Sequence, residues 1–186
     1  MDGIKFEKVS RFKDVDLPLP SRGTEGSAGY DLVVAEDIIL KPYEHLNTII
    51  REGINPSDYW GYKKPLTLDD MAKTTKELKA KVQLVSTGMK AYMPKDVYLK
   101  LLVRSSTPLK HWIMLANSEG VIDSDYADNP DNEGEIFMQL INLAPFAIQL
   151  KRGDKIGQGI FVKYETTEDD AATGARAGGF GSTGTK

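Results

Sequence analysis

A short apolar run leads directly into two carboxylates and a tyrosine, which are residue types suited to general base chemistry. Residues 120–126 read Gly-Val-Ile-Asp-Ser-Asp-Tyr. A strand that ends here could deliver Asp123 into a pocket as a general base, with Tyr126 as a flat wall beside it. Carboxylates and serines are also common in a solvated turn at the end of a strand. The segment alone favours the turn and leaves the catalytic interpretation open.

A second candidate begins where the apolar run 97–103 ends, at Arg104-Ser105-Ser106. Arginine is a poor residue to end a buried strand unless its guanidinium meets a carboxylate or a phosphate. The two serines offer hydroxyl and backbone donors to an oxyanion. A loop closed by a salt bridge explains these residues equally well. Gln158 stands in another apolar run, where a buried amide requires a hydrogen-bond partner.

The third candidate is a glycine-rich segment near the C-terminus, residues 176–184. The backbone N–H groups of such a segment can wrap an anion. Disorder would explain the glycines and serines, but not an arginine and a phenylalanine among them. We therefore expect the segment to close over a ligand, with Arg176 on a phosphate and Phe180 on a base. It lacks the lysine of a P-loop, so it is not a Walker motif.

The elements around these candidates are predicted to be mostly strands. Short apolar runs separated by turn residues predict strands at 4–12, 32–35, 38–40, 46–50, 82–85, 91–93, 97–103, 113–115, 120–122, 136–141, 147–150 and 156–164. One amphipathic helix is predicted within 67–82, in a stretch at about 53–81 that breaks this rhythm. The pattern predicts an all-β sandwich, barrel or jelly roll over residues 1–164, followed by a mobile tail over residues 165–186.

Composition narrows the classes of function. The chain has 186 residues, a net charge of −3, no Cys and two His. This size predicts one domain with a real core, and the absence of a basic excess argues against nucleic acid as a partner. A disulfide scaffold and a thiolate zinc site are excluded. With no signal peptide and no apolar run near the roughly 18 residues of a membrane span, we expect a soluble cytoplasmic protein.

Taken in order, five segments resemble the motifs of the trimeric dUTP pyrophosphatases (dUTPases). They are residues 28–32, 104–106, 117–126, 153–158 and 176–184. Each is weak alone, but all five in this order are highly specific. The resemblance implies a jelly-roll-like subunit in a homotrimer whose active sites take residues from all three chains. It also implies hydrolysis of dUTP to dUMP and pyrophosphate, with Mg²⁺ held on the triphosphate.

The resemblance also implies a role for each matching residue. Asp123 would deprotonate the water that attacks the α-phosphorus, and Tyr126 would pack under the deoxyribose and exclude a 2′-hydroxyl. Asp31 would lie near the water shell of the metal. The uracil would be read by the Asn117 amide and the backbone of Gly120, Val121 and Ile122, and covered by Phe180. The remaining substrate contacts would come from Arg104, Ser105, Ser106, Gln158, Arg176, Gly181, Ser182 and Thr183.

The chain departs from the family pattern at three places. Ser106 stands where the second motif usually ends in glycine, and residues 127–133 form an acidic insertion after Tyr126. Residues from about 53 to 81 stand where the family normally connects its strands directly. We expect this long insert to be a peripheral packing element, with a docking surface for a protein partner as the alternative. Two rival functions stay open: a dCTP deaminase, which shares the fold, and a regulatory binder that uses the long insert.

Overall fold

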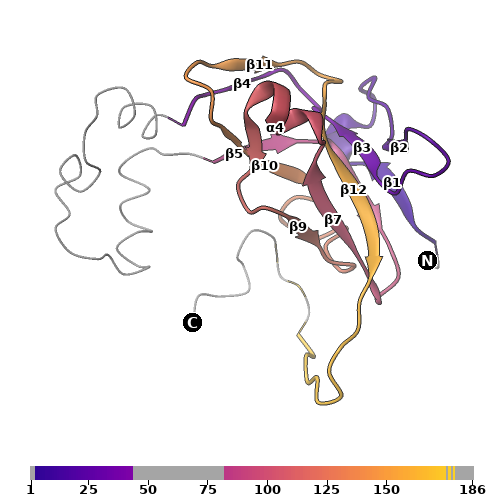
Figure 1. Cartoon of the computed structure of the whole chain (residues 1–186). Helices are drawn as coiled ribbons and strands as arrows, with labels where there is room; N and C mark the ends of the chain where they lie inside the picture. The colour runs from indigo at the N-terminus through magenta and orange to yellow at the C-terminus, as the bar shows by residue number, and fades with distance from the viewer. Residues whose placement is uncertain (1–2, 44–81, 175, 177, 179–186) are drawn as a thin grey trace, which may run out of the picture.

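The computed structural model describes residues 3–43, 82–174, 176 and 178. These residues form short antiparallel strands, one short α-helix and one 3-10 turn (Figure 1). The helix is α4 (Ser106–His111) and the turn is η1 (Ser10–Phe12). The strands are β1 (Lys5–Lys8), β2 (Ser21–Arg22), β3 (Tyr30–Val33), β4 (Ile38–Leu40), β5 (Gln83–Ser86), β6 (Met89–Tyr92), β7 (Val97–Val103), β8 (Ile113–Leu115), β9 (Gly120–Ile122), β10 (Phe137–Asn142), β11 (Ile148–Leu150) and β12 (Lys155–Lys163).

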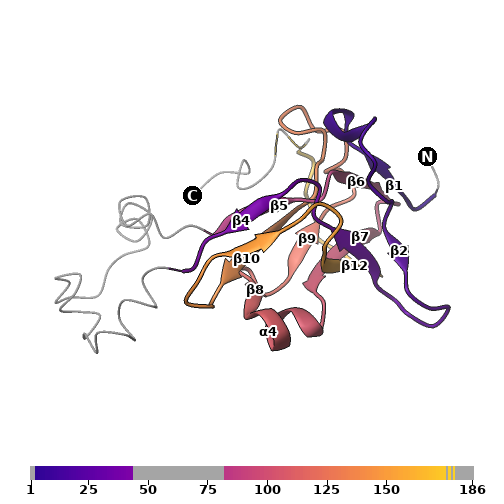
Figure 2. The same cartoon turned by 90° about the horizontal axis from the view of Figure 1, so that it is seen from above.

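The strands form two main sheets and two smaller strand pairs. The larger sheet has the order β2-β3-β12-β7-β9, and the smaller has the order β5-β10-β8. The pairs are β1-β6 and β11-β4. In the view of Figure 2, β5, β10 and β8 lie on one side of the molecule and β7 and β12 lie on the other. This is the layered arrangement of a β-sandwich, in which two sheets bury their facing sides against each other.

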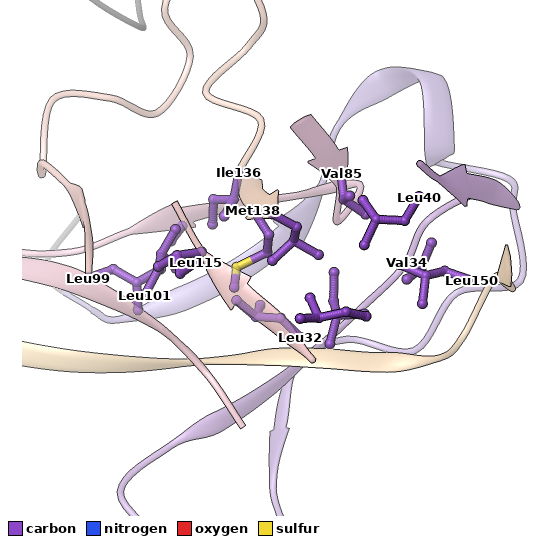
Figure 3. Packing of buried hydrophobic residues seen from close by; sticks show 14 of the residues in the cluster. Leu32, Val34, Leu40, Val85, Leu99, Leu101, Leu115, Ile136, Met138 and Leu150 are labelled. Carbon is purple, nitrogen blue, oxygen red and sulfur yellow. The ribbon is translucent and has the colours of Figure 1, made fainter. Parts of the chain in front are cut away.

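Alternation along the strands explains how this core forms. Leu99 and Leu101 of β7 are buried, and so are Met138 and Leu140 of β10, while the residues between them are more exposed. Because successive side chains of a strand point to opposite faces, each strand contributes every second residue to the core. Figure 3 shows Leu99, Leu101 and Met138 gathered in this core, and Leu140 belongs to the same cluster of buried residues. Each fully buried leucine stabilises the fold by about 1.5–3 kcal/mol.

The all-β fold predicted from the sequence is confirmed, and β7 and β8 have the predicted bounds. The prediction of one strand over residues 4–12 is wrong, because the chain leaves β1 at Lys8 and turns through η1. Helix α4 was not predicted. The helix contains Pro108, which lies in its first turn, where proline is tolerated. Trp112 ends α4 in a left-handed conformation, with φ of 55°.

Several predicted features lie outside the described residues. They are the strand at 46–50, the helix within 67–82 and the long insert at about 53–81 with its proposed partner surface. Within the described ranges, no helix is long and apolar enough to cross a membrane.

Candidate active site

β9 is an edge strand of the five-stranded sheet, and among the described strands it pairs only with β7. The register places Gly120 opposite Leu101 and Ile122 opposite Leu99. Gly120 allows this close approach, because a Cβ there would lie 3.0 Å from the Leu101 Cβ. The outer side of an edge strand presents a row of backbone N–H and C=O groups. β9 therefore offers alternating donors and acceptors to a flat polar ligand.

A cavity of about 200 Å³ opens beside β9. The structure gathers in its wall most of the residues predicted around the carboxylate segment: Asn117, Gly120, Val121, Ile122, Asp123, Tyr126 and Arg176. Leu101, Phe137 and Gln139 also line it, and sequence reasoning missed all three. The sequence held one weak sign that Gln139 has a function. It is a polar residue between Met138 and Leu140, which are both fully buried. Two side-chain amides, a strand edge and a carboxylate thus share one small cavity.

Arg176 closes one side of this cavity by binding both carboxylates of the β9 segment. Its Nη2 pairs with Asp123 Oδ2, and its Nε donates to Asp125 Oδ1 at 2.7 Å. The guanidinium carbon lies 5.7 Å from the centroid of the Tyr126 ring. Burial acts to lower the pKa of Arg176, but the hydrogen bond with Asp125 and the attraction of both carboxylates outweigh it and raise the pKa. Asp125 therefore helps to hold this arginine.

Tyr126 is buried, with 6% of its surface exposed, although its ring lines the cavity. Its hydroxyl donates to the carbonyl oxygen of Glu135 at 3.1 Å. The Tyr126 hydroxyl oxygen in turn accepts a hydrogen bond of 2.9 Å from Asn132 Nδ2. Burial raises the pKa of Tyr126, against the opposing effects of Asn132 and Arg176. The phenol is therefore neutral near pH 7 and presents its ring, not its hydroxyl, to a ligand.

A second group of predicted residues meets around Asp31 on β3. Its Oδ2 pairs with Lys155 Nζ at 2.7 Å, and its Oδ1 pairs with Arg104 Nε at 3.2 Å. Gln158 of β12 lies directly opposite Asp31 in the sheet. Gly29 lies against the Gln158 side chain so closely that any Cβ would clash with it. Three sequence-distant motifs therefore meet at one place, and Lys155 joins them as a cation that sequence reasoning had left without a role.

Ser105 and Ser106 stand at the start of α4, directly after Arg104. Arg104 accepts a backbone hydrogen bond from Thr107 at 2.9 Å through its carbonyl, which closes the first turn. Beside it lies a cavity of about 430 Å³ whose wall includes Arg104, Thr107 and Lys155. We call Arg104, Lys155, Asp31 and the two serines the cationic cluster. Its guanidinium and ammonium groups suit a phosphate ligand.

The cationic cluster and Asp123 lie at opposite ends of β7. Ile122 pairs with Leu99, so Asp123 follows next to Tyr98, whereas Arg104 comes after the other end of the strand. From Tyr98 to Arg104 an extended chain advances about 20 Å, at about 3.3 Å per residue. Within one chain, the two groups of predicted residues therefore form two separate sites.

The described residues do not form a metal site of their own, but they are compatible with a metal ion that is bound to a ligand. Among them, no group of three or more His, Cys, Asp or Glu side chains is placed to hold a metal ion. Both oxygens of Asp31 already face a cation, and Arg176 binds Asp123 and Asp125. Mg²⁺ commonly keeps several waters and binds through substrate phosphates. This donor set is therefore compatible with Mg²⁺ that arrives on a phosphate ligand.

The tail motif is described only in part. Arg176 lies in the β9 cavity, whereas Phe180, Gly181, Ser182 and Thr183 lie outside the described residues. In Figure 1 the chain that follows β12 runs away from the sheet and then turns back on itself. The ion pairs with Asp123 and Asp125 bring the beginning of the tail motif to the carboxylate segment of the same chain.

Comparisons with known proteins point to one family. The dUTPase family model matches residues 68–184. The deoxyuridine 5′-triphosphate nucleotidohydrolase of Lactococcus lactis is 34% identical over 181 residues, which are 96% of each chain. The enzyme of the same name from Zymomonas mobilis is 33% identical over 188 residues, covering 97% of this chain and 98% of its own.

A solved structure agrees with this result. The crystal structure of dUTPase from Streptococcus mutans has a TM-score of 0.65 and 34% sequence identity, and the match covers 88% of this chain and 98% of that one. The family match, the sequence identity and the shared fold lead to the same conclusion. The chain belongs to the dUTPase family.

Proposed function

We propose that this chain hydrolyses dUTP to dUMP and pyrophosphate. The observation that carries the proposal is the β9 cavity, in which a strand edge, two side-chain amides and Asp123 share one wall. The relatives from Lactococcus lactis and Zymomonas mobilis are named for the same reaction. A nucleotide links its base, sugar and α-phosphate in that order. With the base on β9 and the α-phosphate at Asp123, the sugar would lie against Tyr126.

Uracil recognition would rest on the backbone of β9. The Watson–Crick edge of uracil has one N–H donor between two carbonyl acceptors, and a strand edge supplies complementary groups at fixed spacing. Gly120 lets β9 pack closely on β7, and the amides of Asn117 and Gln139 add polar contacts beside it. A volume of about 200 Å³ leaves little space for an added methyl group. These features favour uracil over thymine.

Asp123 would act as the general base once substrate draws Arg176 away. In this structure the Arg176 guanidinium forms an ion pair with the Asp123 carboxylate. A triphosphate carries more charge than a carboxylate and accepts stronger hydrogen bonds from arginine. Freed in this way, Asp123 takes a proton from a water molecule whose oxygen bonds to the α-phosphorus. The bond from that phosphorus to the bridging oxygen breaks, and pyrophosphate leaves.

The cationic cluster would bind the phosphates from a neighbouring subunit. Phosphoryl transfer depends mainly on positioning and on neutralising charge, so Arg104, Ser105 and Ser106 suit this task. About 20 Å along β7 separates Arg104 from the Asp123 of the same chain, which is too far for both to act on one α-phosphate. A homotrimer with shared sites would bring the two groups together. Mg²⁺ on the substrate would supply further neutralisation of phosphate charge.

The proposal is tested by pyrophosphate release from dUTP, dTTP, dCTP and UTP with the wild type and with Asp123→Asn. We expect a strong preference for dUTP. Loss of a general base lowers turnover by about 10²–10⁴-fold, whereas binding of a non-hydrolysable dUTP analogue should persist. Asp125→Asn is the matched control, because Asp125 also binds Arg176 but does not line the cavity. Turnover of Asp123→Asn close to that of this control would refute the assignment of the base.

Measuring ammonia in the same incubations distinguishes the proposed hydrolysis from the alternative, a dCTP deaminase. A dCTP deaminase activates water at the base and releases ammonia, and no pyrophosphate is formed in that step. Ammonia release from dCTP without pyrophosphate release from dUTP would replace the proposed reaction.

A further inference from the structure

The acidic insertion after Tyr126 is folded back on this tyrosine by its own hydrogen bonds. Asn129 is buried, with 5% of its surface exposed, and uses all its hydrogen-bonding capacity. Its Nδ2 donates to the Tyr126 carbonyl oxygen at 2.9 Å and to Asn132 Oδ1 at 2.8 Å. Its Oδ1 accepts from the backbone N–H groups of Asp131 and Asn132 at 3.1 and 3.3 Å. The insertion is therefore an ordered turn with Asn129 at its centre.

These bonds determine which way the Asn132 amide points. Its Oδ1 accepts from Asn129 Nδ2 and from the Gly134 N–H at 3.0 Å. An oxygen at that position is satisfied by two donors, whereas a nitrogen would face both of them without an acceptor. The amide nitrogen must therefore face Tyr126 Oη, to which it donates at 2.9 Å. The Tyr126 hydroxyl is then held between Asn132 and the Glu135 carbonyl.

The ends of the insertion are attached to distant parts of the fold. Asp128 binds Lys90 on β6, and Glu133 accepts hydrogen bonds from Ser10 N and Oγ at 3.0 and 2.8 Å. Glu135, two residues after Glu133, is buried and binds the Arg11 guanidinium with both carboxylate oxygens, at 2.7 and 3.0 Å. Because the turn is held from both sides, the Asn132 amide is a fixed support and not a mobile contact.

We propose that Asn132 is a positioning residue that holds the Tyr126 ring against the sugar and so determines how strongly the enzyme rejects a 2′-hydroxyl. The inference rests on the proposed function, which places the deoxyribose against this ring. Without the Asn132 hydrogen bond, the ring can tilt about its remaining bond to the Glu135 carbonyl. A small tilt makes space for one oxygen atom on the sugar but leaves deoxyribose contacts nearly unchanged. Asn132 thus acts through Tyr126 without touching the nucleotide.

The test compares kcat/KM for dUTP and UTP in the wild type and in Asn132→Ala. We expect the ratio of the two values to fall about three- to tenfold, as for the loss of one neutral hydrogen bond. The fall should come from better use of UTP, while kcat for dUTP changes less than about twofold. Pro130→Ala is the control, because Pro130 is exposed in the same turn and lies outside these bonds. It should keep the wild-type ratio.

The Tyr126→Phe variant keeps the ring and removes the oxygen that Asn132 holds. Tyr126→Phe alone should lower the ratio of kcat/KM for dUTP to that for UTP as Asn132→Ala does. This variant tests whether the held hydroxyl controls sugar selection even if Asn132→Ala fails to fold. Adding Asn132→Ala to Tyr126→Phe should then change the ratio no further. A full additional loss in the double variant would show that Asn132 acts through general stability, and would overturn the proposal.

Binding of dUMP and UMP, measured by calorimetry, gives a readout that does not depend on turnover. If the wild type neither hydrolyses dUTP nor prefers dUMP, the proposed function fails and this inference fails with it. If the wild type does both and Asn132→Ala keeps the full preference for dUMP over UMP, the role of Asn132 alone is refuted.

Discussion

Subunit complementation tests whether the β9 cavity and the cationic cluster act in one chain or in two. Two variants are needed, one damaged in each group: Asp123→Asn and Arg104→Ala. Each is expected to be nearly inactive alone. If one active site takes Asp123 from one subunit and Arg104 from another, a mixed oligomer regains some sites in which both residues are intact.

The activity that the mixed oligomer should recover follows from the distance between the two groups along β7. Tyr98, beside Asp123, and Arg104 are about 20 Å apart in the sheet, so a single chain cannot apply both to one α-phosphate. In a cyclic trimer formed from equal amounts of the two variants, each site draws two neighbouring subunits at random, and about a quarter of the sites are intact. The mixture should then recover about a quarter of the wild-type activity per site.

The assay is pyrophosphate release after the two variants are unfolded together and refolded. A mixture of Asp123→Asn and Asn117→Ala is the control, because both residues line the same cavity of the same chain. That mixture should show no gain over the mean of its parents. The reasoning is wrong if the Asp123→Asn and Arg104→Ala mixture also stays at the parental mean while it forms mixed oligomers.

The inserted turn supports two predictions about stability. The hydrogen bond from Lys90 lowers the pKa of Asp128 below its ordinary value of 3.8, so this pairing stabilises the fold above that pH and is lost as the pH falls through the lowered pKa. Urea unfolding from pH 6 to 3 should show a smaller loss of stability for Asp128→Asn than for the wild type, and equal losses would contradict the pairing. Gly134→Ala should destabilise by about 2–3 kcal/mol, because Gly134 has φ of +79° and its Cβ would lie 2.6 Å from the Tyr126 carbonyl oxygen. Gly153→Ala, at φ of +91° with open space around the Cβ, should cost only about 1 kcal/mol, and an equal cost for the two variants would contradict the clash.

Much of the fold could be predicted because it depends on local patterns. The alternation of apolar and polar residues marks β7 and β8 to the residue, since each strand must turn every second side chain toward the core. Turn residues mark most of the breaks between strands. Helix α4 was not predicted, because its short sequence, which contains Pro108, has no clear helical pattern. The same local resemblance pointed to Asp123, Tyr126 and Asn117, which the structure brings into one cavity.

The rest of the site depends on which strands become neighbours. Gln139 and Phe137 reach the cavity on β10, and Arg176 reaches it from beyond the end of β12. Asn132 faces the Tyr126 hydroxyl only because Asn129 and Gly134 turn its amide that way. The local sequence around one of these residues does not predict which distant residue it will contact.

The amino-acid sequence was thus sufficient to recognise the family, the all-β class and the carboxylate segment that ends in Tyr126. The folded chain was needed to show that Arg104 and Asp123 lie at opposite ends of β7, and that the inserted turn supports the Tyr126 ring. The physical reason is that strand alternation and turn preference are properties of neighbouring residues, whereas sheet register arises from the packing of the whole core. Register places Asp123 beside Tyr98, and that placement makes a second subunit part of the proposed site.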